Sequence, residues 1–198
     1  MLRGLLLQLA LLALPALLAA CASGPGLSTG PFIAGESYHP GLQCAPFANQ
    51  LSGIALYGDA GTWWRKAAGR YRRSDVPEVG AVLVMGRQAR LPDGHVAVVS
   101  RLIDARHIDV MQANWEPGVV DRDQLVVDVS ADNDWTRVRV WWPPARSMGI
   151  TTYRAYGFIL PPSPATHAEL VRAMGPAARL GMETVGRPPP RARLVAGG

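Results

Sequence analysis

Cysteine is scarce in this sequence, which has only two, Cys21 and Cys44, among 198 residues. No C-x-x-C or H-E-x-x-H spacing is present, and zinc sites are commonly built on such spacings. We therefore expect no metal site and no cofactor. Internal repeats are also absent, and the length that remains after the N-terminal segment fits one domain.

The N-terminus carries an apolar run, MLRGLLLQLALLALPALLAAC, that is short for a membrane span. Arg3 gives it a positive start, Pro15 interrupts it and small residues precede Cys21, so it is typical of a cleaved export signal rather than a membrane span. The sequence LAAC at 18–21 resembles the bacterial lipoprotein signal. That resemblance implies cleavage after residue 20 and a lipid on Cys21. An ordinary secretory signal with an incidental cysteine is the alternative.

The residue after this cysteine bears on location. In the lipoprotein pattern an aspartate there favours the inner membrane, and this chain has Ala22. The resemblance therefore implies a protein of the cell envelope, anchored by its N-terminal lipid to the outer membrane and facing the periplasm. The formal net charge of +5 favours an anionic neighbour, such as a cell-wall polymer or lipid head groups. Nucleic acid is not expected as a partner, because the chain is exported and its basic residues form no stripe beyond Arg70, Arg72 and Arg73.

Composition divides the chain into four segments. Residues 1–20 are the signal, and residues 21–37 are rich in Gly, Ser and Pro, which is typical of a flexible tether. The domain proper is expected over residues 38–160. Residues 161–198 are rich in Pro, Ala and Arg and predict a largely disordered tail with one short helix over Ala165–Met174.

Two short helices are predicted at the start of the domain, and strands over the rest. Apolar residues recur at helical spacing from Cys44 to Leu56, and this helix should stop near Gly58. A second helix is expected over Thr62–Ala68. Runs rich in Val and Ile predict strands over 81–85, 95–103, 107–113, 125–129, 137–142 and 156–160. Helices followed by a strand meander indicate an α+β fold, with the N-terminal helices packed on an antiparallel β-sheet.

A thiol at the start of a helix is the first candidate for chemistry. If Cys21 is lipidated, Cys44 is the only free thiol of an exported chain, which suggests intermolecular pairing or a reactive group. The helix N-terminus stabilises an anion, so the thiolate of Cys44 should be favoured. The alternative is a buried, inert cysteine that packs as a small hydrophobic residue.

A histidine and two amides can reach one place in the predicted sheet. His95 begins one strand, and Gln112 and Asn114 stand at the end of the next. A tight turn at Ala105–Arg106 would pair the two strands antiparallel, so that their far ends meet with Gln112 and Asn114 on the same face. A cysteine, a histidine and an amide that orients the histidine form the layout of cysteine nucleophilic catalysis.

Six segments follow one another between residues 38 and 160: QCAPFAN, AGTWW, VPEVGAVLVM, DGHVAVVSRL, VMQANW and YGFILP. In this order and spacing the sequence resembles the CHAP family of cysteine- and histidine-dependent amidohydrolases and peptidases, which have a papain-like fold. The resemblance implies Cys44 as the nucleophile, His95 as the general base and later acid, and Asn114 as the residue that orients the imidazole. Gln43, or the backbone N–H of Cys44, would help to stabilise the oxyanion. Gln112 stands where the family often has Glu.

The resemblance also implies peptidoglycan as the substrate. The bond cut would be the amide between muramic acid and the stem peptide, or a peptide bond in the stem or cross-bridge, and a protein activator is considered as a further partner. Gln112 removes an anionic partner for His95, and Ala81 stands where the family usually has Asp. No acidic cluster precedes Cys44, so the calcium loop of some members is not expected.

Two further functional interpretations stay open. A degenerate CHAP domain that binds cell wall or a partner protein without cutting it is the main alternative, and acyl transfer or action on a lipid amide is another. Among the other histidines, His39, His107 and His167 are weaker candidates for the base, because position and geometry decide that role before residue type.

Overall fold

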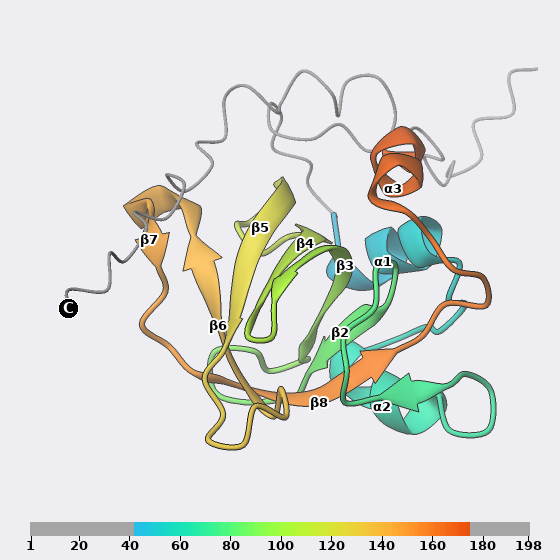
Figure 1. The fold of residues 1–198 in the computed structure, drawn as a ribbon, viewed down its shortest axis with the longest axis horizontal. Helices are drawn as coiled ribbons and strands as arrows, with labels where there is room; N and C mark the ends of the chain where they lie inside the picture. The colour runs from blue at the N-terminus through green and yellow to red at the C-terminus, as the bar shows by residue number, and fades with distance from the viewer. Residues whose placement is uncertain (1–41, 175–198) are drawn as a thin grey trace, which may run out of the picture. The chain divides into compact units, whose positions relative to one another are not determined.

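The computed structural model of the protein describes residues 42–174, and strands make up most of that part (Figure 1). The expected signal, the tether, Cys21 and His39 lie outside the described residues, as does the chain after Met174. The strands are β1 (Arg73–Ser74), β2 (Val82–Met85), β3 (His95–Asp104), β4 (His107–Ala113), β5 (Val120–Asp128), β6 (Arg137–Trp142), β7 (Ser147–Met148) and β8 (Tyr153–Ile159).

Six antiparallel strands close into a barrel. The sheet runs in the order β8-β2-β3-β4-β5-β6, and β6 then pairs with β8 to complete the circle. In the closing pair, Arg137 lies opposite Arg154 and Val138 opposite Tyr153. The short strands β1 and β7 extend the sheet beside β8 and β6.

The expected α+β fold, with N-terminal helices packed on an antiparallel sheet in a papain-like arrangement, is therefore wrong. The described chain is mostly a closed barrel with a few short helices. All four residues of β2 are buried, and so are the first six of β3. Because successive side chains of a strand point to opposite faces, both faces of these strands are covered. The apolar runs in the sequence reflect this burial, but they do not encode the β6–β8 pairing that closes the sheet.

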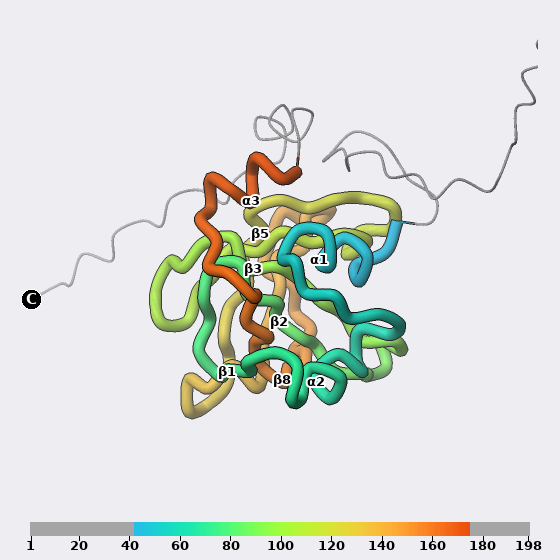
Figure 2. Tube along the Cα trace, turned by 90° about the vertical axis from the view of Figure 1, so that its right-hand side faces the viewer, coloured from blue at the N-terminus to red at the C-terminus, as the bar shows by residue number. Residues whose placement is uncertain are grey.

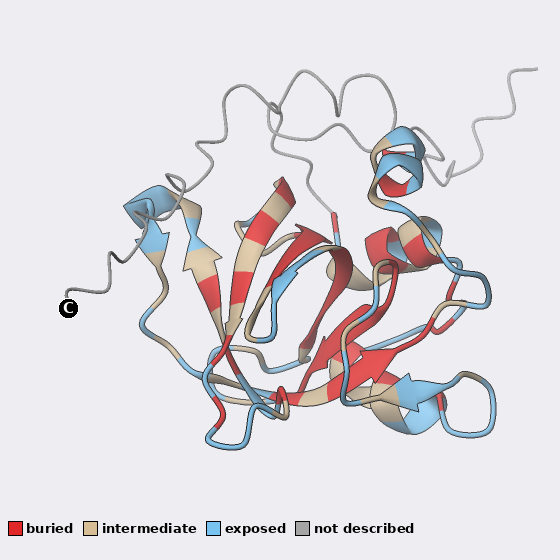
Figure 3. Cartoon of the chain, viewed as in Figure 1, coloured by how far each residue is buried: buried red, intermediate tan, exposed pale blue. Residues whose placement is uncertain are grey.

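Two apolar clusters cover these two faces. Figure 3 shows the buried residues in red along the central strands. The barrel core fills the interior and is made mainly of strand residues, among them Leu83, Met85, Ala97, Val99, Val110, Val138 and Phe158. The outer core lies between the opposite face of the sheet and the helices, and it includes Val82, Val84, Val96, Val98, Phe47, Trp63 and Leu170. The helices thus pack on the outside of the barrel rather than on one side of an open sheet.

In the described part of the chain, five short helical segments accompany the barrel: α1 (Cys44–Ser52), η1 (Ala60–Thr62), α2 (Trp63–Lys66), η2 (Pro143–Ala145) and α3 (His167–Ala173). Figure 2 looks at the side that carries α1, α2 and α3. The helix expected to run on to Leu56 ends earlier, because Gly53 adopts a left-handed φ of 73° and its N–H caps the carbonyl of Asn49. Ile54 and Leu56 are buried in the outer core after the helix has ended. The second helix is confirmed as η1 followed by α2.

The predicted bounds of the strands agree best with the structure where tight turns join the strands. The strands expected at 107–113 and 137–142 have those bounds, and the turn at Ala105–Arg106 joins β3 to β4 with Asp104 opposite His107. β5 begins at Val120, five residues before its predicted start, and polar residues at its beginning hide it from an apolar pattern. β1 and β7 are two-residue strands that the sequence did not predict.

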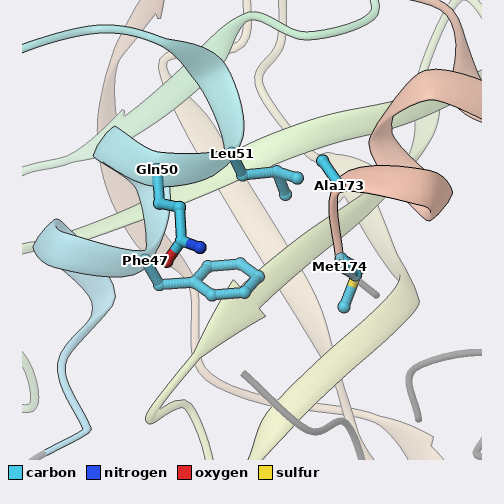
Figure 4. Close-up of a pocket in the computed structure, with 5 residues that line it drawn as sticks. All are labelled: Phe47, Gln50, Leu51, Ala173 and Met174. Carbon is cyan, nitrogen blue, oxygen red and sulfur yellow. The ribbon is translucent and has the colours of Figure 1, made fainter. Parts of the chain in front are cut away.

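The helix predicted over Ala165–Met174 is confirmed as α3. Thr166 caps it through a capping box with Glu169. Its Leu170 is buried in the outer core, so this part of the segment assigned to the tail packs on the barrel. A small apolar cleft separates α3 from α1, and side chains of both helices point into it (Figure 4), namely Phe47, Gln50, Leu51, Ala173 and Met174.

Candidate functional site

Cys44 is the first residue of α1. The preceding residue, Gln43, has an extended backbone (φ −133°, ψ 146°) and places no side-chain cap on the helix, so the first N–H groups of α1 need other partners. The thiol of Cys44 is surrounded by backbone N–H groups, its own and those of Ala45 and Val96. Val96 is the neighbour of His95 on β3, so the fold brings the helix start to the strand that carries the histidine.

The protonation state of this thiol differs from the sequence prediction. Cys44 is free and partly buried, and burial raises the pKa of its thiol, although the backbone N–H groups act in the opposite direction. The sequence placed the thiolate at a helix start and expected it to be favoured. The packing around the sulfur outweighs the helix N-terminus, so the resting group is a neutral thiol.

His95 begins β3 opposite Met85 and is 4 % exposed. Its Nε2 lies 2.9 Å from Oε1 of Gln112, which is fully buried. Burial lowers the pKa of His95 to about 4, and the bond to Gln112 offsets only part of that effect. The imidazole is therefore neutral at neutral pH. The strand pairing was expected to bring Asn114 to His95, with Gln112 on the same face, and Gln112 is the side chain that reaches the ring.

A second buried amide orients the first. The side-chain N–H of Gln112 donates to Oε1 of Gln124 on β5. This leaves Oε1 of Gln112 facing the ring, so His95 Nε2 carries the proton and donates it to that oxygen. The ring nitrogen Nδ1 then keeps a free lone pair, as a general base requires. The sequence analysis missed Gln124 because it lies in the polar start of β5, before the predicted strand.

Asn114 has a different position from the one expected. Its backbone is left-handed, with a φ of 62°, and its Oδ1 accepts a hydrogen bond from the backbone N–H of Gly118 at 2.9 Å. Its side chain thus shapes the turn after β4, while the hydrogen bond to His95 Nε2 comes from Gln112. Within residues 42–174 the orienting amide is therefore Gln112 rather than Asn114.

Aromatic side chains form one wall of the site. The Trp115 ring meets the His95 ring edge-on, with centroids 5.0 Å apart, and Tyr153 packs against Trp115 in the same way at 5.1 Å. Trp115 therefore helps to exclude water from the imidazole, which is the physical cause of its low pKa. Gln43, the residue that precedes α1, is exposed.

Two carboxyl groups, those of Glu116 and Asp121, lie near Gln112. Asp121 on β5 is directly opposite Gln112, is 3 % exposed and is hydrogen-bonded to Glu116. Burial raises the pKa of Asp121 to about 7, and the charge of Glu116 adds to the effect. Burial also raises the pKa of Glu116. Sequence analysis did not single out this pair, since neither residue stands in a recognisable motif.

The rival histidines are engaged elsewhere. His107 Nδ1 lies 2.6 Å from Asp104 at the β3–β4 turn. His167 on α3 contacts Asp123, with Nε2 3.1 Å from Oδ1. Both contacts join neighbouring elements, so these histidines stabilise the fold at places other than the start of α1.

The comparison with known families bears on the same residues. The model of the CHAP domain family matches residues 33–114, a stretch that contains Cys44, His95, Gln112 and Asn114. No curated protein matches the chain. The resemblance to the CHAP family is thus confirmed over this stretch.

Within residues 42–174, no helix has the length and apolar character needed to cross a bilayer.

Proposed function

Because residues 33–114 match the CHAP domain, we propose that the protein is a lipid-anchored peptidoglycan hydrolase that cleaves an amide bond through Cys44 and His95. The observation that carries the proposal is the buried chain from His95 to Gln112 to Gln124, which leaves one imidazole nitrogen unprotonated. His95 lies on β3 next to Val96, whose backbone adjoins the Cys44 thiol at the start of α1. Peptidoglycan is the substrate class that the family suggests. The bond is either the muramoyl amide or a peptide bond in the stem or cross-bridge.

The reaction begins with a neutral thiol and a neutral imidazole. His95 Nδ1 accepts the proton of Cys44 as the sulfur attacks the amide carbonyl, which gives a tetrahedral oxyanion. The backbone N–H groups at the start of α1 donate to that oxyanion, and the exposed Gln43 stands beside them. The C–N bond then breaks, and His95 returns the proton to the leaving amine. A thioester on Cys44 remains.

Hydrolysis of the thioester completes the cycle. Water gives a proton to His95 Nδ1 and attacks the carbonyl, and the S–C bond breaks to release a carboxylic acid. The proton then returns to the sulfur. During each step the imidazolium is stabilised by the carbonyl of Gln112, which is a weaker partner than a carboxylate. A slow enzyme is expected for that reason.

Digestion of purified sacculi by the mature protein tests the proposal. Mass spectrometry of the released fragments identifies the new termini, and with them the bond that is cut. Cys44→Ala should abolish release, whereas His107→Ala, which changes a histidine at a distant turn, should preserve it. Equal fragment profiles from the wild type and Cys44→Ala, with any activating partner present, would exclude the hydrolase.

A non-catalytic CHAP domain that binds cell wall or a partner protein is the second candidate. Two observations favour it: an amide replaces a carboxylate beside His95, and burial raises the pKa of the Cys44 thiol. In that case Cys44→Ala would bind sacculi as well as the wild type does, and neither would release fragments.

The lipid anchor at Cys21 is tested by fractionation, since Cys21→Ser should release the protein from membranes.

A further inference from the structure

Two aromatic rings form a platform on the outer side of the barrel. Trp64 of α2 and Tyr156 of β8 are both partly exposed, and their rings are nearly parallel, at 22°, with centroids 6.4 Å apart. They line an open groove together with Gly69, Tyr71, Arg73, Ser74 and Asp75. None of these residues takes part in the site around Cys44 and His95.

A glycine lies against each of the two rings. Gly157 has a φ of 120°, and a Cβ there would come within 3.1 Å of the Trp64 ring. A Cβ on Gly86 would come within 3.0 Å of the Tyr156 ring. Each ring therefore packs directly on backbone, at a position where a larger residue would displace it. The two glycines therefore leave room for both rings at this place.

An arginine guanidinium group lies over each of the two rings. The guanidinium carbon of Arg73 lies 4.9 Å from the Trp64 ring centroid, and that of Arg154 lies 5.5 Å from the Tyr156 ring centroid. Arg73 also donates to the backbone carbonyl of Trp64 at 3.2 Å. Both arginines are exposed, and within residues 42–174 neither forms a salt bridge. Stacking holds each guanidinium in place and leaves other N–H groups at its edge for an anion.

The charge around the groove is mainly positive. Arg70 adds a third guanidinium, 5.9 Å from the centroid of the Tyr71 ring. Asp75 is the acidic residue of the groove lining. Planar guanidinium groups recognise carboxylates through paired hydrogen bonds, and aromatic rings with arginine stems offer apolar surface to the C–H faces of sugars.

The platform lies on the same face of the sheet as Cys44. The thiol of Cys44 adjoins the backbone of Val96 on β3, Val96 is paired with Val84 on β2, and Val84 with Gly157 on β8, under the Trp64 ring. These positions are separated by two strand spacings, which is about 10 Å. A polymer bound at the platform can therefore extend to the start of α1.

We propose that this groove binds a carboxylate-bearing glycan strand, with Arg73 and Arg154 holding carboxylates and the Trp64–Tyr156 surface contacting sugar rings. The inference rests on the proposed function for the identity of the polymer, and it assigns the substrate a second contact away from the reacting bond. Binding at the platform keeps the strand near Cys44 between cleavage events.

Binding of the full-length chain to purified sacculi tests the proposal, with Cys44→Ala in every sample so that nothing is cut. In a sedimentation assay, Arg73→Gln/Arg154→Gln should raise the apparent dissociation constant by about tenfold, the loss expected from two charge-assisted contacts. The matched control is Arg146→Gln/Arg172→Gln, which removes two exposed arginines elsewhere and the same net charge. Equal weakening by both pairs would overturn the proposal.

The ligand chemistry is tested with the same proteins. Amidation of the carboxylates of the sacculi should weaken binding of the parent protein to the level of Arg73→Gln/Arg154→Gln and leave that variant unaffected. Undiminished binding to amidated sacculi would overturn the assignment, as would arginine-dependent binding to anionic phospholipid vesicles that equals binding to sacculi. Thermal unfolding followed by circular dichroism verifies that each variant is folded.

This outcome is separable from that of the proposed function. Binding is measured in a protein that lacks the nucleophile, so an inactive wild type that still binds through Arg73 and Arg154 would refute the hydrolase and support the groove. An active wild type, together with unchanged binding in Arg73→Gln/Arg154→Gln, would support the hydrolase and refute the groove. Trp64→Leu gives a second probe of the platform, and it should also weaken binding.

Discussion

His95 Nε2 lies 2.9 Å from Gln112 Oε1 in a part of the barrel where both side chains are buried. Gln112 stands where the CHAP family often has Glu, so an amide oxygen meets the ring in place of a carboxylate. A carbonyl oxygen fixes the orientation of the ring as a carboxylate does, but it stabilises a positive ring less. The geometry of the site is thus fixed by buried hydrogen bonds, while its histidine is neutral at neutral pH.

The first prediction concerns the reactivity of Cys44. Because burial raises the pKa of its thiol, alkylation by iodoacetamide should be slow at neutral pH and should reach its half-maximal rate at a higher pH than a free thiol does. The rate is measured by mass spectrometry on Cys21→Ser, which leaves Cys44 as the sole cysteine. Rapid labelling near pH 6 would show that the thiolate is favoured after all.

The second concerns Gln124, which we regard as a positioning residue for Gln112. Gln124→Leu removes the acceptor of the Gln112 side-chain N–H and leaves that group buried without a partner, at a cost of about 1–3 kcal/mol in stability. The free amide can then turn its N–H toward His95. We expect kcat to fall by about tenfold with KM little changed, as is typical of lost orientation.

The conservative variant Gln124→Glu separates positioning from stability. It keeps an acceptor oxygen at the same place, so it should restore most of the kcat that Gln124→Leu loses, even if the added charge lowers the melting temperature. Loss of kcat in strict proportion to loss of folded protein in both variants would contradict the positioning role.

The third concerns acid stability and His95. Its pKa is lowered from 6.5 to about 4 in the folded state, so the unfolded chain binds a proton first as the pH falls. The stability associated with the neutral ring is complete above pH 6.5 and is lost between pH 6.5 and pH 4, by an amount on the order of 3 kcal/mol. Urea unfolding of wild type and His95→Gln at pH 4, 5 and 7 measures it. The difference between the two proteins should narrow or reverse on acidification, and a constant difference would be inconsistent with a buried neutral histidine.

The fourth concerns Asp121, whose contribution to stability should change with pH in the opposite direction to that of His95. Its pKa is raised from 3.8 to about 7 in the folded state, so the folded protein holds the proton more tightly than the unfolded chain does. The corresponding stability is complete below pH 3.8 and is lost as the pH rises through 7, by a few kcal/mol in order of magnitude. Asp121→Asn should therefore gain stability over the wild type at pH 8 and show little difference at pH 4. An exposed carboxyl offers the control, since Asp132→Asn should change neither value.

The local features of the fold were predictable because they are encoded by neighbouring residues. The alternation in RVRVWW predicted β6 with its bounds, and the short Ala105–Arg106 turn predicted the pairing of β3 with β4. That pairing predicted that His95 would lie near Asn114, with Gln112 on the same face, and in the structure Gln112 is the amide that reaches the ring. The sequence likewise indicated a cysteine at the start of a helix and a resemblance to the CHAP family.

What the tertiary structure decided depends on contacts between residues far apart in the chain. Pairing of β6 with β8 turned an expected open sheet into a closed barrel, and no local pattern specifies which strand an edge will meet. Gln124 reaches Gln112 from the next strand, through a register that a bulge shifts. Burial set the pKa values of Cys44 and His95, and desolvation is a property of the whole packed environment. The sequence by itself determined the local elements and the approach of β3 and β4, because neighbouring residues encode them. The tertiary structure determined which amides meet His95 and which groups are charged, because burial and strand register depend on distant contacts.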